Sequence, residues 1–208
     1  MNKILLALLV SAMPLLSSAN TLVFTPQFDS ASFAVTGYGS FSETGSVSNA
    51  QFGSFSTAGT GNGTLTATFI GASASFTNFY VQYGNLLTND TVGSSTSMIL
   101  TGAQNPIEFY FDTANPKPAD SSTPTQAVNG DIFSSSSPLS FALLDVAGTP
   151  EDTYYLGFND YFNGEPDFND YVVKLTYATT VPVPASLPLM VSALGLFGFG
   201  VSRKRSTK

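Results

Sequence analysis

The sequence predicts an all-β protein whose central region, residues 20–180, folds as a β-sandwich or jelly roll. Apolar and polar residues alternate with a period of two in several short segments, as in strands that bury one face. Clusters of Gly, Pro, Asn, Asp and Ser separate these segments. No stretch between the two ends of the chain has a helical period. We therefore expect many short strands joined by turns.

The alternation is clearest in four segments. In Thr64–Ile70 we expect the apolar residues to face the core and the threonines to face the other side. The same pattern predicts three further strands, whose core-facing residues are Ile107, Phe109 and Phe111; Tyr154, Leu156 and Phe158; and Tyr171, Val173, Leu175 and Tyr177. In the last of these, Val172, Lys174 and Thr176 face the other side.

Two further segments have a recognisable composition. Tyr38–Gly45 matches Phe52–Gly59 at a shift of 14 residues, which predicts two neighbouring strands, because a solenoid needs about three or more repeats. Ala114–Ser137 is rich in Pro and Ser, and we expect it to form a long excursion over the surface.

The composition excludes several classes of protein. The chain has no Cys and no His, so disulfides, the usual zinc, iron–sulfur and haem ligand sets, and Ser-His-Asp or Cys-His catalytic arrangements are absent. Fourteen acidic residues stand against seven basic ones, giving a net charge of −7. An acidic surface repels phosphate backbones, so we expect no nucleic-acid partner.

The first 19 residues have the order of a secretory signal peptide. Lys3 precedes the apolar run Ile4–Val10, and the small residues Ser17 and Ala19 fit the positions that signal peptidase recognises. We expect cleavage after Ala19. A buried N-terminal helix is the alternative, but the run is short, follows a basic residue and ends in small residues.

Residues 181–208 carry a second targeting feature. Prolines lead into the uncharged segment Ala185–Val201, whose 17 residues are at the short end of the roughly 17–25 that cross a bilayer as a helix. Arg203, Lys204 and Arg205 follow and should stay in the cytoplasm under the positive-inside rule. The sequence therefore predicts a single C-terminal transmembrane helix, with the acidic central region on the far side of the membrane.

This tail resembles the PEP-CTERM sorting signal of Gram-negative bacteria, in which a proline motif, a short apolar helix and a basic cluster follow one another. The Pro-Glu-Pro triad of that family maps onto Pro182-Val183-Pro184, with Val183 in place of Glu, and with Ala185 the stretch is similar to the Val-Pro-Leu-Pro-Ala variant. The resemblance implies an exosortase, a membrane protease, as processing partner. It also implies an inner-membrane anchor until processing, then release to the cell envelope or extracellular matrix.

Seven of the fourteen acidic residues fall within the 26 residues from Asp145 to Asp170. Ca²⁺ takes about 6–8 oxygen ligands, so carboxylates and amides gathered ahead of a strand form a candidate calcium site. The spacing is not that of an EF-hand. The alternative is that these Asp and Asn side chains cap turns by bonding to local backbone N–H groups. The candidate ligands are Asp160, Glu165, Asp167, Asn169 and Asp170.

The same stretch resembles a motif that closes the extracellular β-domain of many PEP-CTERM proteins. It reads Asp167-Phe168-Asn169-Asp170-Tyr171-Val172-Val173 and is preceded by Gly157-Phe158-Asn159-Asp160. Glu165-Pro166 stands where an Asp-Arg pair is more usual. The resemblance implies a bacterial surface domain of a kind suspected of binding calcium.

Evidence for catalysis in the sequence is weak. Asp160 with Asp167 could form a glycosidase acid/base pair, but any acidic loop offers two carboxylates. The serines have no His base, and Lys117 and Lys174 are the only central lysines. We therefore expect no enzymatic activity, with an envelope polysaccharide hydrolase as the minority interpretation.

A binding function is the stronger alternative. Phe76, Phe79, Tyr80 and Tyr83 could form a platform for stacking sugars or, alternatively, pack into the core. The sequence thus predicts a non-enzymatic protein of the cell surface or of the exopolysaccharide (biofilm) matrix. Its expected partners are signal peptidase, an exosortase and the inner membrane. The alternative is a calcium-dependent carbohydrate-binding module.

Overall fold

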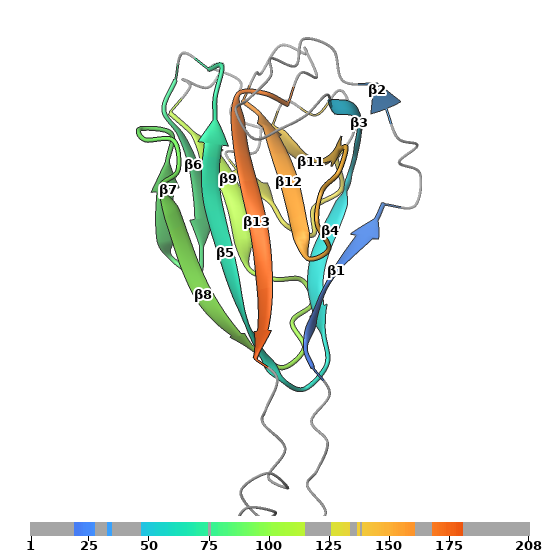
Figure 1. The fold of residues 1–208 in the computed structure, drawn as a ribbon. Coiled ribbons are helices and arrows are strands. Elements are labelled where there is room, and N and C mark those ends of the chain that lie inside the picture. Colours follow the sequence, from blue (N-terminus) through green and yellow to red (C-terminus); the bar gives the residue numbers. More distant parts are fainter. Residues whose placement is uncertain are drawn as a thin grey trace, which may run out of the picture. The chain divides into compact units, whose positions relative to one another are not determined.

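Thirteen β-strands and no helix are found in the part of the chain that the structure, a computed structural model, describes (Figure 1). This confirms the all-β prediction. The described residues are 19–27, 33–34, 47–74, 76–114, 126–133, 137, 139–160 and 168–180. The strands are β1 Thr21–Pro26, β2 Phe33–Ala34, β3 Val47–Gln51, β4 Gly53–Ala58, β5 Asn62–Gly71, β6 Asn78–Gln82, β7 Asn85–Thr88, β8 Ser95–Thr101, β9 Phe109–Thr113, β10 Gln126–Val128, β11 Ser140–Val146, β12 Thr153–Asn159 and β13 Tyr171–Thr180.

These strands form three sheets in which every pair is antiparallel. The largest has seven strands in the order β2-β3-β11-β12-β13-β5-β8. A four-stranded sheet has the order β10-β9-β6-β7, and β1 pairs with β4 alone. In Figure 1, β13 runs through the middle of the seven-stranded sheet, with β5 on one side and β12 on the other.

The four predicted alternating segments correspond to β5, β9, β12 and β13, except that Ile107 lies two residues before β9 begins. Leu65, Ala67 and Phe69 are buried, while the threonines between them are half-buried, as predicted. Lys174 lies opposite Tyr155 on one side and Thr68 on the other, on the face turned away from the core. The remaining core-facing residues that the alternation predicted are buried except Tyr154, which is half-buried.

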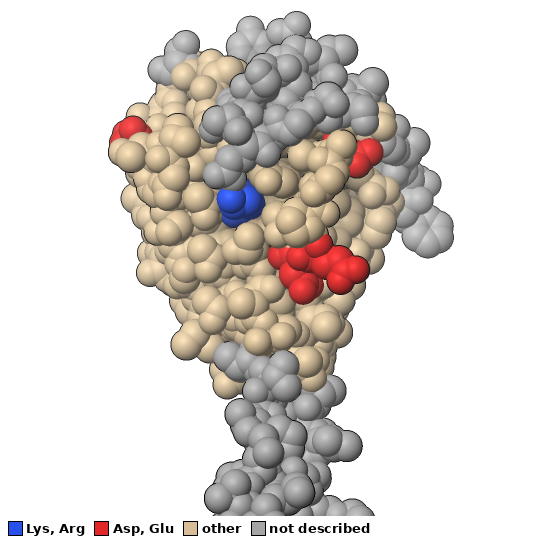
Figure 2. Space-filling model, in the orientation of Figure 1, with Lys and Arg blue, Asp and Glu red and all other residues tan. Residues whose placement is uncertain are grey.

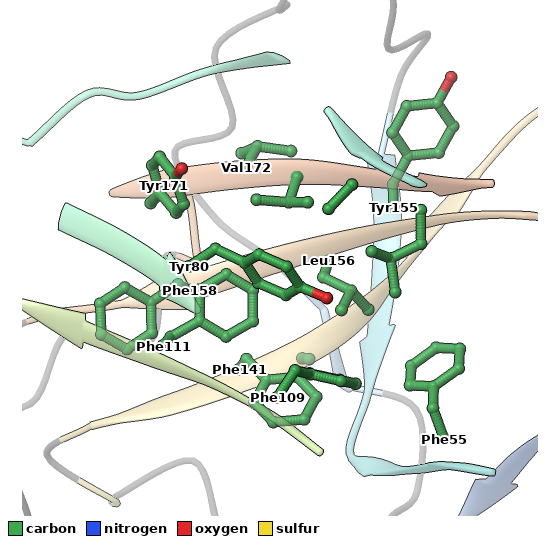
Figure 3. Packing of buried hydrophobic residues seen from close by; sticks show 14 of the residues in the cluster. Phe55, Tyr80, Phe109, Phe111, Phe141, Tyr155, Leu156, Phe158, Tyr171 and Val172 are labelled. Atoms are coloured by element: carbon green, nitrogen blue, oxygen red, sulfur yellow. The ribbon is translucent and has the colours of Figure 1, made fainter. Parts of the chain in front are cut away.

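Aromatic side chains join the two large sheets face to face, an arrangement consistent with a β-sandwich (Figure 3). Phe111 of β9 stacks on Phe158 of β12, with ring centroids 5.2 Å apart. Phe109 of β9 lies 5.5 Å from Phe141 of β11, and Tyr171 of β13 donates a hydrogen bond of 2.9 Å to the carbonyl of Leu87 in β7. Burying such large rings supplies most of the favourable energy of a core of this kind.

The β1–β4 pair is tied to the rest of the domain by Asn129, a buried residue that follows β10. Its Oδ1 accepts a 2.8 Å hydrogen bond from the N–H of Phe55, and its Nδ2 donates 2.8 Å bonds to the carbonyls of Phe55 and Ile107. The amide therefore satisfies backbone groups of β4 as a neighbouring strand would.

The first and last strands bring the two ends of the described unit, Ala19–Thr180, to the same place. Thr21 lies opposite Ala58, and Thr180 lies opposite Asn62. Because the turn between Ala58 and Asn62 is short, β1 begins close to where β13 ends (Figure 1).

Several predictions lie outside the described residues. These are residues 1–18 of the predicted signal peptide 1–19, the tail 181–208 and the first repeat copy, Tyr38–Gly45. Within the described part no helix is long and apolar enough to cross a membrane. The expected excursion Ala114–Ser137 was partly wrong, because Gln126–Val128 within it is strand β10, which pairs with β9.

Candidate functional site

A buried polar cluster forms where β12 ends and β13 begins. Phe158 lies opposite Tyr171 in this antiparallel pair, so the residues just beyond β12 and just before β13 are neighbours in space. The N–H of Asp160 donates a 2.8 Å hydrogen bond to Oδ2 of Asp170. Asp160 is 4% exposed and Asp170 is 9% exposed. The sheet register therefore brings the Asp170 carboxylate to the backbone of Asp160, ten residues away in the sequence.

A third member, Asn78, comes from the opposing sheet at the start of β6. Its Nδ2 donates to Oδ2 of Asp160 at 2.8 Å and to the carbonyl of Asp170 at 3.1 Å. The side chain is completely buried. The Asn78 N–H in turn donates to Oδ1 of Asn89 at 3.3 Å, and Nδ2 of Asn89 donates to the carbonyl of Phe76 at 3.0 Å, which fixes the chain entering β6.

One atom of this cluster has no hydrogen-bond partner. The Oδ1 of Asn78 is buried and accepts no hydrogen bond, although Nδ2 of the same amide makes two. A buried acceptor left without a partner costs about 1–3 kcal/mol, and such groups in native proteins often mark a bound water or ion. The Nδ2 end of the Asn78 amide faces both aspartates, and the unpartnered oxygen is bonded to the same amide carbon.

Phe168 and Gly157 determine how the segment before β13 approaches the sheet. Phe168 is fully buried, has a φ of 49° and packs edge-on against Phe52 with ring centroids 5.7 Å apart. A Cβ at Gly157 would lie 2.2 Å from the carbonyl oxygen of Phe168 and 2.9 Å from its Cβ. Glycine at 157 therefore leaves the space in which the Phe168 backbone crosses β12, and the next two residues reach the cluster from there.

The structure places the predicted site residues unequally. Asp160 and Asp170 meet in the cluster. Asn169 instead bonds to the chain after β5: its Oδ1 accepts from Oγ of Ser73, and its carbonyl accepts from the Ser73 N–H at 3.0 Å. Glu165 and Asp167 lie outside the described residues. The Asp170 carboxylate accepts from the backbone N–H of Asp160 ten residues earlier, and the Asp160 carboxylate accepts from Asn78 of the opposing sheet.

The donor set fits a hard cation. Carboxylate, amide and carbonyl oxygens suit Ca²⁺ or Mg²⁺, whereas transition metals prefer His or Cys, which this chain lacks. Among the described residues, no three His, Cys, Asp or Glu side chains are grouped to hold a metal. A cation here would therefore draw its remaining ligands from amides and carbonyls, the class to which the Asn78 oxygen belongs.

The proposed aromatic platform is not formed. Tyr80 is fully buried and its hydroxyl donates a 2.9 Å hydrogen bond to Oε1 of Gln82 within the core. Burial raises the pKa of Tyr80 well above its ordinary value, and the neighbouring Tyr171 and Tyr83 add to the shift. Phe79, the next residue on β6, is half-buried and points to the other face of the sheet. These side chains therefore cannot stack on one sugar.

Sequence reasoning missed Asn78 and Ser73, the two residues that other parts of the chain contribute to this region. Each lies about 90 positions from its partners near β13, as the separations of 92 and 96 residues show. An Asn before a strand is typical of any turn. Only the packing of the two sheets identifies Asn78 as a site residue.

The chain matches no protein-family model, no curated protein and no solved structure.

Proposed function

We propose that this chain is a non-enzymatic exported protein of the cell surface or exopolysaccharide matrix of a Gram-negative bacterium, with a β-sandwich domain, of jelly-roll type, that binds calcium. Signal peptidase removes residues 1–19, and the PEP-CTERM-like tail directs the chain to an exosortase. The observation that carries the calcium assignment is the buried contact of Asn78, whose amide oxygen has no partner, with the Asp160 carboxylate and the Asp170 carbonyl.

Calcium is the cation that the cluster fits best. Asp160 and Asp170 supply carboxylate oxygens, and Asn78 supplies an amide oxygen in the same buried space. Buried carboxylates are stable when they are paired or ligate a metal. Glu165 and Asp167, close by in the sequence, are further candidate ligands for an ion that takes about 6–8 oxygens.

The burial of Asp160 also argues against hydrolysis. A glycosidase acid must touch the oxygen of the bond that it cleaves. Asp160 is 4% exposed and is bonded to Asn78, so a polysaccharide chain cannot reach it. The chain contains no His or Cys for a nucleophile–base pair. A structural and binding role therefore fits better than catalysis.

The cluster and the last residue of the domain lie at opposite ends of β13. Asp170 comes just before β13, and Thr180 ends this ten-residue strand. At about 3.3 Å per residue, β13 is roughly 33 Å long. The cluster thus lies at the end of the domain opposite Thr180, where the chain continues to the predicted tail.

The test of the calcium proposal is thermal unfolding of the purified full-length chain in about 1 mM Ca²⁺, in about 1 mM Mg²⁺ and in EDTA. A ligand present at 100 times its Kd adds about 2.7 kcal/mol, which raises the Tm by several degrees. We expect this rise for Ca²⁺. Asp160→Asn and Asp170→Asn should abolish the rise, even if their Tm in EDTA also changes.

Glu108→Gln is the matched control, because Glu108 is an exposed carboxylate outside the cluster. It should keep the full calcium-dependent rise. Equal Tm values in Ca²⁺ and EDTA for the unaltered chain would reject the calcium assignment and leave the cluster as a purely structural tie.

Sorting is tested separately by fractionating cells that express the chain. We expect the unaltered protein in the envelope or medium, shortened at its C-terminus. Replacing Pro182 and Pro184 by Ala should leave the full tail on a protein held in the inner membrane. Release of the double variant at the normal rate would contradict the proposed processing motif.

A further inference from the structure

A cleft with a volume of about 330 Å³ lies on β3, β11 and β12, away from the acidic cluster. This volume is at the small end of the roughly 300–1,000 Å³ of small-molecule sites and suits one or two sugar rings. Its lining includes Tyr154 and Tyr155 of β12 and several hydrogen-bonding residues, among them Asn49 and Gln51 of β3 and Asp145 of β11.

The register of the sheet places these side chains together. Gln51 lies opposite Leu143, and Leu143 lies opposite Leu156. Because Tyr154 is two residues before Leu156 on β12, it points to the same face as Gln51. Pairing between β3 and β11 shifts register between Leu144 and Val146, around Asp145. Such irregularities change the direction of a side chain and are frequent near binding sites.

The cleft is accessible yet firmly built. Tyr154 and Gln51 are half-buried, and Asp145 is exposed. The Tyr154 ring is held edge-on against Phe55, with centroids 5.2 Å apart and planes at 80°. A ring that is already fixed loses little conformational entropy when a ligand packs on it.

The turn that joins β11 to β12 stiffens the rim. The Thr149 side chain donates a 2.7 Å hydrogen bond to the carbonyl of Val146, and its N–H donates to the same carbonyl at 3.4 Å. The N–H of Thr153 donates to the carbonyl of Pro150 at 3.2 Å. The turn at the rim of the cleft is therefore held by its own hydrogen bonds and does not need a ligand to order it.

The charge of the residues that line the cleft disfavours anionic ligands. No Lys or Arg lines the cleft, and Asp145 adds a negative charge. Lys174 is the single basic residue in the described part of the chain, and the face in Figure 2 is mostly uncharged with grouped acidic residues. Anionic sugars would be repelled. A tyrosine hydroxyl is protonated at neutral pH, and burial, to which Asp152 adds, raises the pKa of Tyr154 further.

We propose that this cleft binds a neutral hexose unit of a polysaccharide. The apolar face of the sugar packs on the ring of Tyr154, and its hydroxyls bond to the planar groups of Gln51, Asn49 and Asp145. A ring with amide and carboxylate groups around it provides both the apolar contact and the directional bonds that a sugar needs. The inference names the partner of the proposed surface protein but does not depend on the cation site.

The test is affinity electrophoresis of the full-length chain, kept soluble in a detergent without a sugar headgroup. The gels contain laminarin, dextran, galactomannan or hydroxyethyl cellulose as neutral probes, and alginate as the anionic probe. Each gel is run with calcium and with EDTA. We expect retardation by at least one neutral polysaccharide and none by alginate.

Variants locate the site. Tyr154→Ala and Gln51→Ala should each weaken retardation by about tenfold or more, and Tyr154→Phe should keep most of it. Tyr110→Ala removes another half-buried tyrosine, on β9, and should change nothing. Because Tyr154 packs on Phe55, Tyr154→Ala could impair folding; Gln51→Ala and Asp145→Ala then decide the question.

The proposal is overturned if no neutral probe retards the protein in either buffer, or if retardation survives the Gln51 and Asp145 substitutions. Stronger retardation by alginate than by the neutral probes would also overturn it. The calcium assignment is judged on the thermal shift alone, so failure of one proposal does not imply failure of the other.

Discussion

Asn78 and Asp160 are 82 positions apart in the sequence, yet the Nδ2 of Asn78 donates a 2.8 Å hydrogen bond to the Oδ2 of Asp160 inside the protein. Asn78 begins β6 of the four-stranded sheet, and Asp160 follows β12 of the seven-stranded sheet. This polar contact therefore ties the two sheets together at one end of an aromatic core.

Asn78 provides the sharpest test of the cluster. Asn78→Ala should lower the free energy of unfolding by about 1–3 kcal/mol, because Asp160 and the carbonyl of Asp170 lose a buried donor. It should also reduce the stabilisation by calcium. Urea unfolding in calcium and in EDTA measures both effects.

Asn78→Asp should increase the stabilisation by calcium, whereas Asn78→Ala should reduce it. A third carboxylate beside Asp160 and Asp170 raises repulsion in EDTA, whereas a bound cation relieves it. The difference in unfolding free energy between calcium and EDTA should therefore exceed that of the unaltered chain. A smaller difference would mean that the Asn78 oxygen does not face a cation.

Gly157→Ala tests the approach of the segment before β13. The new Cβ would lie 2.2 Å from the carbonyl oxygen of Phe168, a backbone atom that cannot rotate away. We expect a loss of about 1–3 kcal/mol or more and a smaller calcium-dependent shift, because the displaced segment carries Asp170. Thr176→Ala, on the outward face of β13, is the control and should cost little. Full calcium response in a destabilised Gly157→Ala protein would separate the cluster from this contact.

Asn129→Ala tests the tie between β4 and the rest of the domain. The substitution removes three hydrogen bonds of 2.8 Å and leaves backbone groups of Phe55 and Ile107 unpaired in a buried place. We expect a loss of about 2 kcal/mol or more, seen as a lower urea midpoint. Asn85→Ala, at an exposed position of β7, should leave the midpoint nearly unchanged. Equal midpoints for the two variants would contradict this role of Asn129.

Stability should fall at alkaline pH because of buried tyrosines. Burial raises the pKa of Tyr171, with Asp90 adding to the shift, and burial likewise raises that of Tyr80. In the unfolded chain both titrate near 10. Their contribution is complete below pH 10 and is lost as the pH rises above it, since only the unfolded chain then releases the protons.

The measurement is urea unfolding between about pH 8 and 12 alongside tyrosinate absorbance. Tyr171→Phe should flatten the decline, because one raised pKa is removed. If all nine tyrosines ionise near pH 10 while the protein remains folded, the predicted linkage is wrong.

The strands were predictable where one face is buried along the whole segment. The alternation in Thr64–Ile70 and in Tyr171–Tyr177 located β5 and β13, because side chains of a strand point alternately to its two faces. Alternation did not predict that Val172, on the outward face, is also fully buried. Whether a residue on the outward face of a strand is buried depends on which other segments pack against that face.

The candidate site was half predictable. Asp160 and Asp170 stood out because carboxylates cluster around a turn before a strand, and the structure brings them together. Asn169 belonged to the same run but bonds to Ser73, since its place beside β5 follows from sheet packing. Asn78 had no local signal at all.

The sequence by itself determined the all-β class, the alternation that builds the core and the absence of His, Cys and disulfide chemistry, because composition and short-range periodicity are properties of the chain alone. The tertiary structure decided which strands are neighbours, that Tyr80 is core rather than surface, and that Asn78 meets Asp160 and Asp170. Those facts depend on contacts between separate segments, and the two contacts of Asn78 join residues 82 and 92 positions apart. Such contacts are chosen by the packing of whole sheets, which no single segment encodes.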